Sequence, residues 1–162
     1  MKLNLLLHLT GIIILISLIN SCSYKTLPTT ETFPATEVNF LSGKEGTITL
    51  RSVGTGVNIE DAINSAEKNA INVLLFRGIP GSEQKTALIG INETEEINIH
   101  KEYFTRLYGE DRYKTFVMSS IPSTELIKYK AGKKSITVDI KINLVALRTD
   151  LEQNKIIRKF GF

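Results

Sequence analysis

The sequence has no tryptophan, a single cysteine, two histidines and little excess of charge of either sign. One cysteine excludes an intramolecular disulfide and a thiolate metal cluster. A multi-histidine metal site is excluded too, because His8, one of the two histidines, falls in the first 21 residues, which have the pattern of a removed leader and leave one histidine after it. The 20 Lys and Arg against 17 Asp and Glu leave a formal charge of +3, which does not indicate nucleic-acid binding. The 162 residues fit one modest domain with an appendage.

The first 21 residues have the three regions of a secretory signal peptide. Lys2 supplies a positive charge, a mostly apolar stretch runs from Leu3 to Ile19, and Ser21 is a small residue at the end. A transmembrane anchor is the alternative, but a spanning helix needs roughly 20 continuous apolar residues, and the stretch here is interrupted. We therefore predict a leader over residues 1–21.

The only cysteine stands directly after this leader. The sequence Ile19-Asn20-Ser21-Cys22 resembles the lipobox of bacterial lipoproteins. The resemblance implies that Cys22 takes a diacylglycerol on its thiol and that the leader is cleaved before it, so that the lipid bilayer becomes a partner of the chain. Ser23 is not an acidic retention signal, which implies the outer membrane and leaves the membrane face open. The alternatives are an incidental cysteine and an ordinary secreted protein.

Residues 22–45 are predicted to be the acylated cysteine and a tether. Threonine and proline are frequent from Ser23 to about Glu37, and no helical or alternating pattern is present. Such a composition favours an extended linker, partly of polyproline type. At about 3.1 Å per residue, its fifteen or so residues reach about 45 Å from the bilayer.

Residues 46–162 are predicted to form a single domain. A strand is expected at Thr47–Val53, ended by a turn at Gly54-Thr55-Gly56. Asn58 then suits the N-cap of a helix that runs to about Arg77. The three alanines Ala62, Ala66 and Ala70 lie four residues apart, so this helix can approach a sheet closely.

The second half of the domain is dominated by alternation. Every even position from Ile136 to Ala146 is apolar, which predicts a strand with one covered and one wet face. The other expected elements are a short strand at 86–91, a helix at 97–108, strands at 113–119 and 125–130, and a helix at 148–154. The fold class predicted is α+β, with two layers in which helices pack on one face of a mostly antiparallel sheet.

The lipobox, the strand ending in Gly54-Thr55-Gly56 and the alanine-spaced helix together are similar to small envelope α+β modules. These modules include those of certain surface lipoproteins and the N-terminal domain of the flagellar assembly protein T. The resemblance covers about 40 residues. It implies a binding or assembly role and carries over no catalytic residue.

Two motifs with catalytic or cofactor associations have structural explanations. Gly54-x-Gly56 follows a strand, but Ile59 stands where a dinucleotide fingerprint needs its third glycine, so a turn is expected. Ser65 and Lys68 match S-x-x-K without the partner motifs of the penicillin-recognising enzymes, and a solvated helix face is expected. No cofactor is therefore predicted.

His100 is the one histidine after the leader, and we expect it at the rim of an aromatic helix face. The alternative is a small hydrolase or ligand-binding enzyme that uses His100 with a serine or acid brought near by folding. The acidic group Glu93, Glu95 and Glu96 lacks the loop pattern of a calcium site and is expected in an exposed loop or at a helix start.

The clearest candidate contact for a partner is a group of lysines around the Ala131-Gly132 turn, with a tyrosine among them: Lys128, Tyr129, Lys130, Lys133 and Lys134. Such a group suits an anionic envelope polymer or lipid headgroups. The alternative is a hairpin tip whose lysines keep the strand edges soluble. Likewise, the closing Lys159–Phe162 could present aromatics to a partner or pack on the sheet.

The function predicted is that of a membrane-anchored envelope lipoprotein, non-enzymatic, which serves as a binding or assembly subunit with an envelope protein partner. Its expected place is the outer membrane, on either face.

Overall fold

The computed structural model describes residues 38–129 and 132–158. The predicted leader, Cys22, the tether as far as Glu37, Lys130 and the closing Lys159–Phe162 lie outside these residues. The predictions made for them stay predictions.

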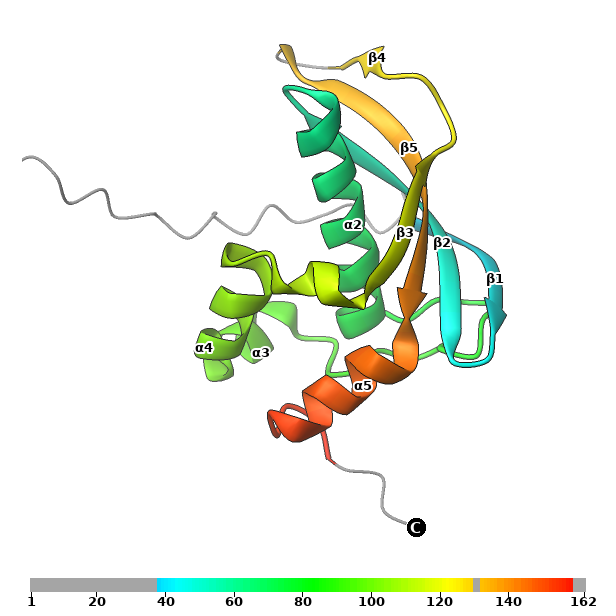
Figure 1. The fold of residues 1–162 in the computed structure, drawn as a ribbon. Coiled ribbons are helices and arrows are strands. Elements are labelled where there is room, and N and C mark those ends of the chain that lie inside the picture. The colour runs from blue at the N-terminus through cyan, green and yellow to red at the C-terminus, as the bar shows by residue number, and fades with distance from the viewer. Residues whose placement is uncertain (1–37, 130–131, 159–162) are drawn as a thin grey trace, which may run out of the picture. The chain divides into compact units, whose positions relative to one another are not determined.

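The described residues form a five-stranded antiparallel sheet in the order β1-β2-β5-β3, with β4 pairing with one end of β5 (Figure 1). The strands are β1 (Val38–Lys44), β2 (Thr47–Gly56), β3 (Val117–Pro122), β4 (Ile127–Lys128) and β5 (Lys134–Asn143). The helices are α2 (Ile59–Phe76), α3 (Glu93–Ile99), α4 (Lys101–Phe104) and α5 (Leu144–Gln153).

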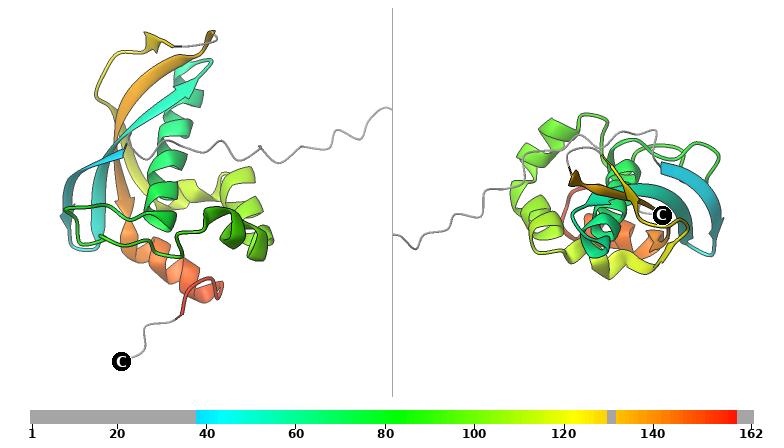
Figure 2. Two further views of the ribbon diagram at one scale, coloured as in Figure 1. Left: turned by 180° about the vertical axis from the view of Figure 1, so that it is seen from behind. Right: turned by 90° about the horizontal axis from the view of Figure 1, so that it is seen from above.

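The helix α2 lies along one face of the sheet, and α3 and α4 lie beyond it on the same side (Figures 1 and 2). The predicted α+β class is therefore confirmed. It follows that the opposite face of the sheet is open within the described part of the chain.

Two glycines let α2 approach β2 very closely. A Cβ at Gly54 would lie 1.9 Å from the carbonyl oxygen of Ala62, and a Cβ at Gly56 would lie 2.4 Å from the amide nitrogen of Ala62. The predicted turn at Gly54-Thr55-Gly56 is therefore wrong, because β2 continues through Gly56, with Gly54 and Gly56 facing the helix backbone. The alanine line Ala62, Ala66 and Ala70 is fully buried, as its spacing predicted.

The helix α2 begins and ends where the sequence predicts. The side chain of Asn58 accepts a hydrogen bond of 2.9 Å from the amide of Asp61, and Arg77 is the C-cap residue. Gly78 follows with φ of 76°, a left-handed conformation that glycine adopts without strain. The predicted N-cap and C-terminal limit of this helix are both confirmed.

The strand β5 shows the predicted alternation, with Ile136, Val138, Ile140 and Ile142 buried. It ends at Asn143, earlier than predicted. The side chain of Asn143 accepts a hydrogen bond from the amide of Ala146 and caps α5, so that the last apolar positions of the alternating run belong to the first turn of a helix.

The segment 86–91, predicted as a strand, has no regular structure. The amides of Leu88 and Ile89 donate to the carbonyls of Leu74 and Leu75 at the end of α2. The segment therefore donates hydrogen bonds to carbonyl groups that have no partner within the helix at its C-terminal end. Its short apolar run does not reveal this tertiary contact.

The predicted helix 97–108 begins four residues earlier, at Glu93, with Asn92 as its N-cap. It is interrupted at His100 and continues as α4 and a π-helical turn, Thr105–Gly109. The acidic group thus stands at a helix start, one of its two expected places.

Two strand boundaries also differ. The predicted strand 113–119 begins only at Val117, because Arg112–Phe116 form a 3₁₀ turn whose spacing buries both Tyr113 and Phe116. The strand predicted at 125–130 is limited to Ile127–Lys128 among the described residues. In addition, β1 occupies residues 38–44, which were assigned to the tether, and pairs with β2.

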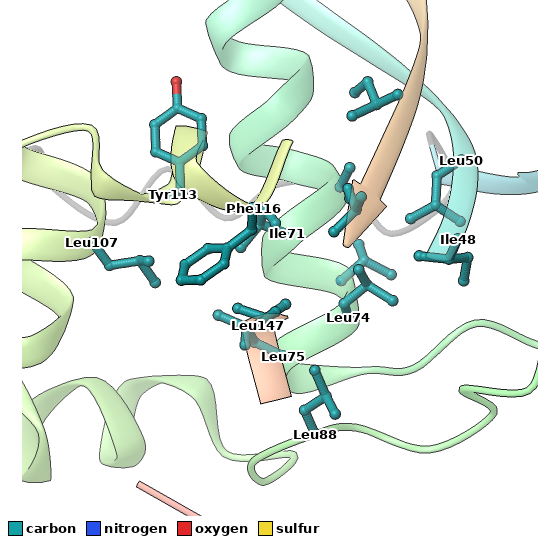
Figure 3. Packing of buried hydrophobic residues seen from close by; sticks show 14 of the residues in the cluster. Ile48, Leu50, Ile71, Leu74, Leu75, Leu88, Leu107, Tyr113, Phe116 and Leu147 are labelled. Atoms are coloured by element: carbon teal, nitrogen blue, oxygen red, sulfur yellow. The ribbon is translucent and has the colours of Figure 1, made fainter. Parts of the chain in front are cut away.

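The core lies between α2 and the sheet and continues under α5 and the 3₁₀ turn Arg112–Phe116, which we call the aromatic turn (Figure 3). Ile48 and Leu50 of β2 meet Ile71, Leu74 and other aliphatic residues of α2. Tyr113 is fully buried, and its hydroxyl points away from the aliphatic side chains (Figure 3). Burial raises the pKa of Tyr113, and the negative charge of Glu67 adds to the effect.

A buried carboxylate joins α4, the 3₁₀ turn and α5. Asp150 accepts a hydrogen bond of 2.8 Å from the hydroxyl of Tyr103 and pairs with both terminal nitrogens of Arg112. Burial together with this hydrogen bond raises the pKa of Tyr103. The ends of three elements are therefore fixed to one another by a single charged group.

The close approach predicts that Gly54→Ala destabilises the protein by about 3 kcal/mol or more, because the added methyl group meets the helix backbone rather than a flexible side chain. Urea unfolding followed by circular dichroism measures the change. Gly109→Ala is the matched control: the nearest atom to its Cβ lies 3.9 Å away, so we expect a change within about 0.5 kcal/mol. Equal effects of the two substitutions would refute this account of α2.

Candidate binding surfaces

The lysine group lies at one end of the sheet, where β4 and β5 form a hairpin at the end that also carries the start of α2 (Figure 1). Lys128 is the cross-strand partner of Lys134, and the amide of Tyr129 donates a hydrogen bond of 2.8 Å to the carbonyl of Lys133. All four of these side chains are exposed. The hairpin expected around these lysines is therefore present.

Exposed apolar side chains, which sequence reasoning missed as a group, stand at the same end. The exposed fractions are 71% for Val57, 51% for Ile59 and 61% for Ile127. The ladder relates them to the lysines, because Gly56, which precedes Val57, pairs with Lys134. We call the following residues the hairpin end: Val57, Ile59, Ile127, Lys128, Tyr129, Lys133 and Lys134.

A signal for this cluster exists in the sequence. Val57 directly precedes the helix cap Asn58, where an apolar residue usually packs against the fourth helical residue. Here the fourth residue is Ala62, which is fully buried under the sheet, while Val57 remains exposed. The apolar residue before the cap is therefore what the sequence shows at this position, and its exposure is seen only in the structure.

The open face of the sheet carries an ion pair at its centre. Arg51 of β2 and Asp139 of β5 are cross-strand partners, and the guanidinium donates two hydrogen bonds, of 2.7 and 2.8 Å, to the two carboxylate oxygens. Ile121 of β3 pairs with Asp139 on the other side and is 63% exposed. Sequence reasoning did not find this pair, because its members lie 88 residues apart and only the strand register brings them together.

The hydrogen bonds from Arg51 lower the pKa of Asp139, and the positive charge of Arg51 adds to this effect. The same hydrogen bonds raise the pKa of Arg51. Both groups are therefore ionised at neutral pH, and the centre of the open face carries no net charge.

The residues considered for catalysis hold structural contacts. His100 stands between α3 and α4, with its Nε2 3.8 Å from a carboxylate oxygen of Glu96. The hydroxyl of Ser65 accepts a hydrogen bond from the amide of Thr55. Lys68 donates to the carbonyl of Tyr108 and forms a 3.0 Å ion pair with Asp111. Ser65 and Lys68 were expected on a solvated face, but both instead tie α2 to its neighbours.

The acidic residues at the start of α3 each contact a different neighbouring side chain. Glu93 accepts a hydrogen bond from the side chain of Asn72, and Glu95 accepts one from Asn92. Among the residues that the structure describes, no group of three histidine, cysteine, aspartate or glutamate side chains could hold a metal ion.

A shallow, open depression of about 390 Å³ lies on α4 and the turn after it. It is lined by Lys101, Glu102, Thr105 and Arg106. The hydroxyl of Thr105 is already bound to the carbonyl of Lys101. The depression therefore has no buried polar group directed into it.

No protein-family model matches the chain, and comparison with curated proteins and with solved structures found no significant match. Within residues 38–129 and 132–158, no helix has the length and apolar character needed to span a bilayer.

The ion pair on the open face predicts a pH-dependent contribution to stability. At pH 7 Asp139→Asn lowers the free energy of unfolding by less than about 1 kcal/mol, because the pair is partly solvated. The pKa of Asp139 in the folded protein lies below its ordinary value of 3.8. The contribution is therefore complete above that value and is lost as the pH falls through the folded pKa.

Urea unfolding of the wild type and Asp139→Asn, measured in steps from pH 7 down to about pH 1, follows the difference as the carboxylate becomes protonated. Glu125→Gln is the control, because Glu125 is exposed and outside the strands. A difference between wild type and Asp139→Asn that persists at the low pH would contradict the assignment.

Proposed function

We propose that this chain is a lipid-anchored envelope lipoprotein of the outer membrane whose α+β domain acts, without catalysis, as a binding or assembly subunit. The observation that carries the binding role is the open face of the sheet. The lipobox Ile19-Asn20-Ser21-Cys22 carries the anchor.

The composition of the open face suits a protein partner. Its central charges neutralise each other through the bidentate pair of Arg51 and Asp139. Interfaces that form and separate have about the polarity of ordinary protein surface, with few unpaired charges at their centre. Around the pair the outward positions hold threonines, two apolar residues and one exposed lysine: Thr47, Thr49, Val53, Thr55, Ile121, Thr137 and Lys141. The central pair can therefore be desolvated without leaving either of its charges unpaired, while Lys141 adds one exposed cation beside it.

The anchor is tested by Cys22→Ser. We expect this variant to lose incorporation of labelled palmitate and to leave the membrane fraction or accumulate as an uncleaved precursor, because no other cysteine is present to take the lipid. Ser23→Ala leaves the cysteine intact and is the control. Palmitate labelling that survives Cys22→Ser would contradict the anchor.

The partner is tested by copurification from mild-detergent extracts of membranes. The envelope proteins retained by the wild type are identified first, and their yield is then compared with Thr49→Arg and Ile121→Arg. We expect each variant to reduce the yield about tenfold or more, since an unpaired arginine in a buried interface costs more than about 1.4 kcal/mol.

Ile91→Arg is the matched control, because Ile91 is 91% exposed and lies outside the sheet. Two results would count against the open face as the binding surface. One is the recovery of no envelope protein with the wild type, and the other is an equal loss with Ile91→Arg.

A further inference from the structure

We infer that the hairpin end is a second interaction surface, which docks on an anionic lipid bilayer and so orients the domain against the membrane. The inference deepens the proposed function and rests on it only in that the anchor holds the domain near a bilayer. The occupant of this surface is a lipid bilayer with negatively charged headgroups.

Charge at the hairpin end favours such a bilayer. Lys128 and Lys134 stand directly opposite each other across β4 and β5, and like charges in this position destabilise a sheet. Within the described residues neither of them forms an ion pair. A headgroup phosphate placed between the two ammonium groups relieves their repulsion and supplies the missing counter-charge.

The apolar side chains at this end point to a bilayer rather than to a free anion. Ile127 precedes Lys128 in β4 and so projects from the opposite face of the hairpin, and Val57 follows the residue that pairs with Lys134. Tyr129 is 49% exposed, and tyrosine is enriched at the depth of lipid headgroups. Exposed aliphatic side chains at the same end of the sheet as the lysines match a surface that, when it meets a bilayer end-on, places apolar groups between headgroups and cations at their phosphates.

The carboxylates of this region lie on neighbouring elements. Glu60 and Asp61 are in the first turn of α2, where negative charge stabilises the helix end. Glu125 precedes β4. Asp61 lies against Gly56, the cross-strand partner of Lys134, whereas the lysines belong to the β4–β5 hairpin itself.

The chain between anchor and domain is long enough for this contact. Fifteen residues, 23–37, separate Cys22 from Val38 and span at most about 45 Å when extended. Val38 pairs with Ser52 of β2, four residues before the last residue of that strand, or about 13 Å from the hairpin end at about 3.3 Å per residue. The tether therefore reaches more than far enough for the hairpin end to meet the bilayer.

The test uses the whole chain, purified from membranes and incorporated into vesicles of phosphatidylcholine, with or without phosphatidylglycerol. Because Cys22 is the only cysteine, a cysteine introduced at Ile127→Cys is the single free thiol of the acylated protein and takes an environment-sensitive fluorophore. Ile99→Cys is the matched control, since Ile99 is 63% exposed against 61% for Ile127 and lies in α3, away from β4 (Figure 1).

With phosphatidylglycerol present, we expect the probe at position 127 to shift to shorter wavelength, to brighten about twofold or more and to be quenched by brominated lipid. The probe at position 99 is expected to keep the emission of an aqueous environment in both vesicles. A water-like emission at position 127 in anionic vesicles, or the same response at position 99, would overturn the inference.

The lysines are tested by adding Lys128→Gln and Lys134→Gln to the labelled chain. Each change lowers the docked-to-undocked ratio about fivefold, because a lysine near an anionic surface contributes about 1 kcal/mol. Lys44→Gln with Lys141→Gln removes the same charge from exposed positions outside the hairpin end and is expected to leave the signal unchanged. Docking that persists without Lys128 and Lys134 would contradict the assignment.

The outcomes separate this inference from the proposed function. A chain that does not incorporate into vesicles speaks against the anchor; the probe at position 127 is then read in a chain that also carries Cys22→Ser, mixed with preformed anionic vesicles. Loss of the signal on addition of dextran sulfate, with no lipid quenching beforehand, would indicate binding of an anionic polymer and would overturn the bilayer as the occupant.

Discussion

The packing of α2 on β2 is the constraint on which the rest of the domain depends. With no side chain at Gly54 and Gly56 and only methyl groups on the alanine line of α2, the helix backbone comes within contact distance of the strand. Such packing permits little sliding or rotation of α2. Either movement would bring a larger side chain of the helix opposite the glycines and push the two layers apart. The orientation of α2 therefore fixes which of its residues meet β3, the aromatic turn and the start of the hairpin end.

Polar residues of α2 form hydrogen bonds and ion pairs with neighbouring elements, instead of forming a solvated face. The hydroxyl of Ser120 on β3 donates a hydrogen bond of 2.5 Å to the buried carboxylate of Glu67. Lys68 holds the chain after α4 through its contacts with Tyr108 and Asp111, and its ammonium lies 5.2 Å from the ring centre of Tyr113. Ties of this kind are directional, so they select one arrangement of the outer helices where apolar packing alone would tolerate several.

Local signals in the sequence were sufficient for α2 and β5. An Asx cap, an alanine line and strict alternation are each decided by residues within one element, and all of them reappear in the structure. The signals failed where a tertiary contact decides. Nothing near Leu88 shows that its amide will serve the end of α2, and nothing near Tyr113 shows that a 3₁₀ turn will bury it. Of the candidate surfaces, the lysine hairpin was predictable because its residues are contiguous, whereas Arg51 and Asp139 meet only through the register of β2 and β5.

The same architecture leaves two separate surfaces for the two contacts that we propose. The core occupies the α2 face of the sheet, so within residues 38–129 and 132–158 no helix covers the open face, which is the surface proposed for a protein partner. The hairpin end lies at the edge of that face, where Gly56 and Lys134 begin the last row of the ladder. A bilayer that contacts the end of the sheet leaves the centre of the open face, around Arg51, uncovered, because that centre is five residues from Gly56 along β2, about 17 Å at about 3.3 Å per residue. In the proposed arrangement the open face is turned sideways along the bilayer, which is the direction from which a partner held in the same membrane would approach.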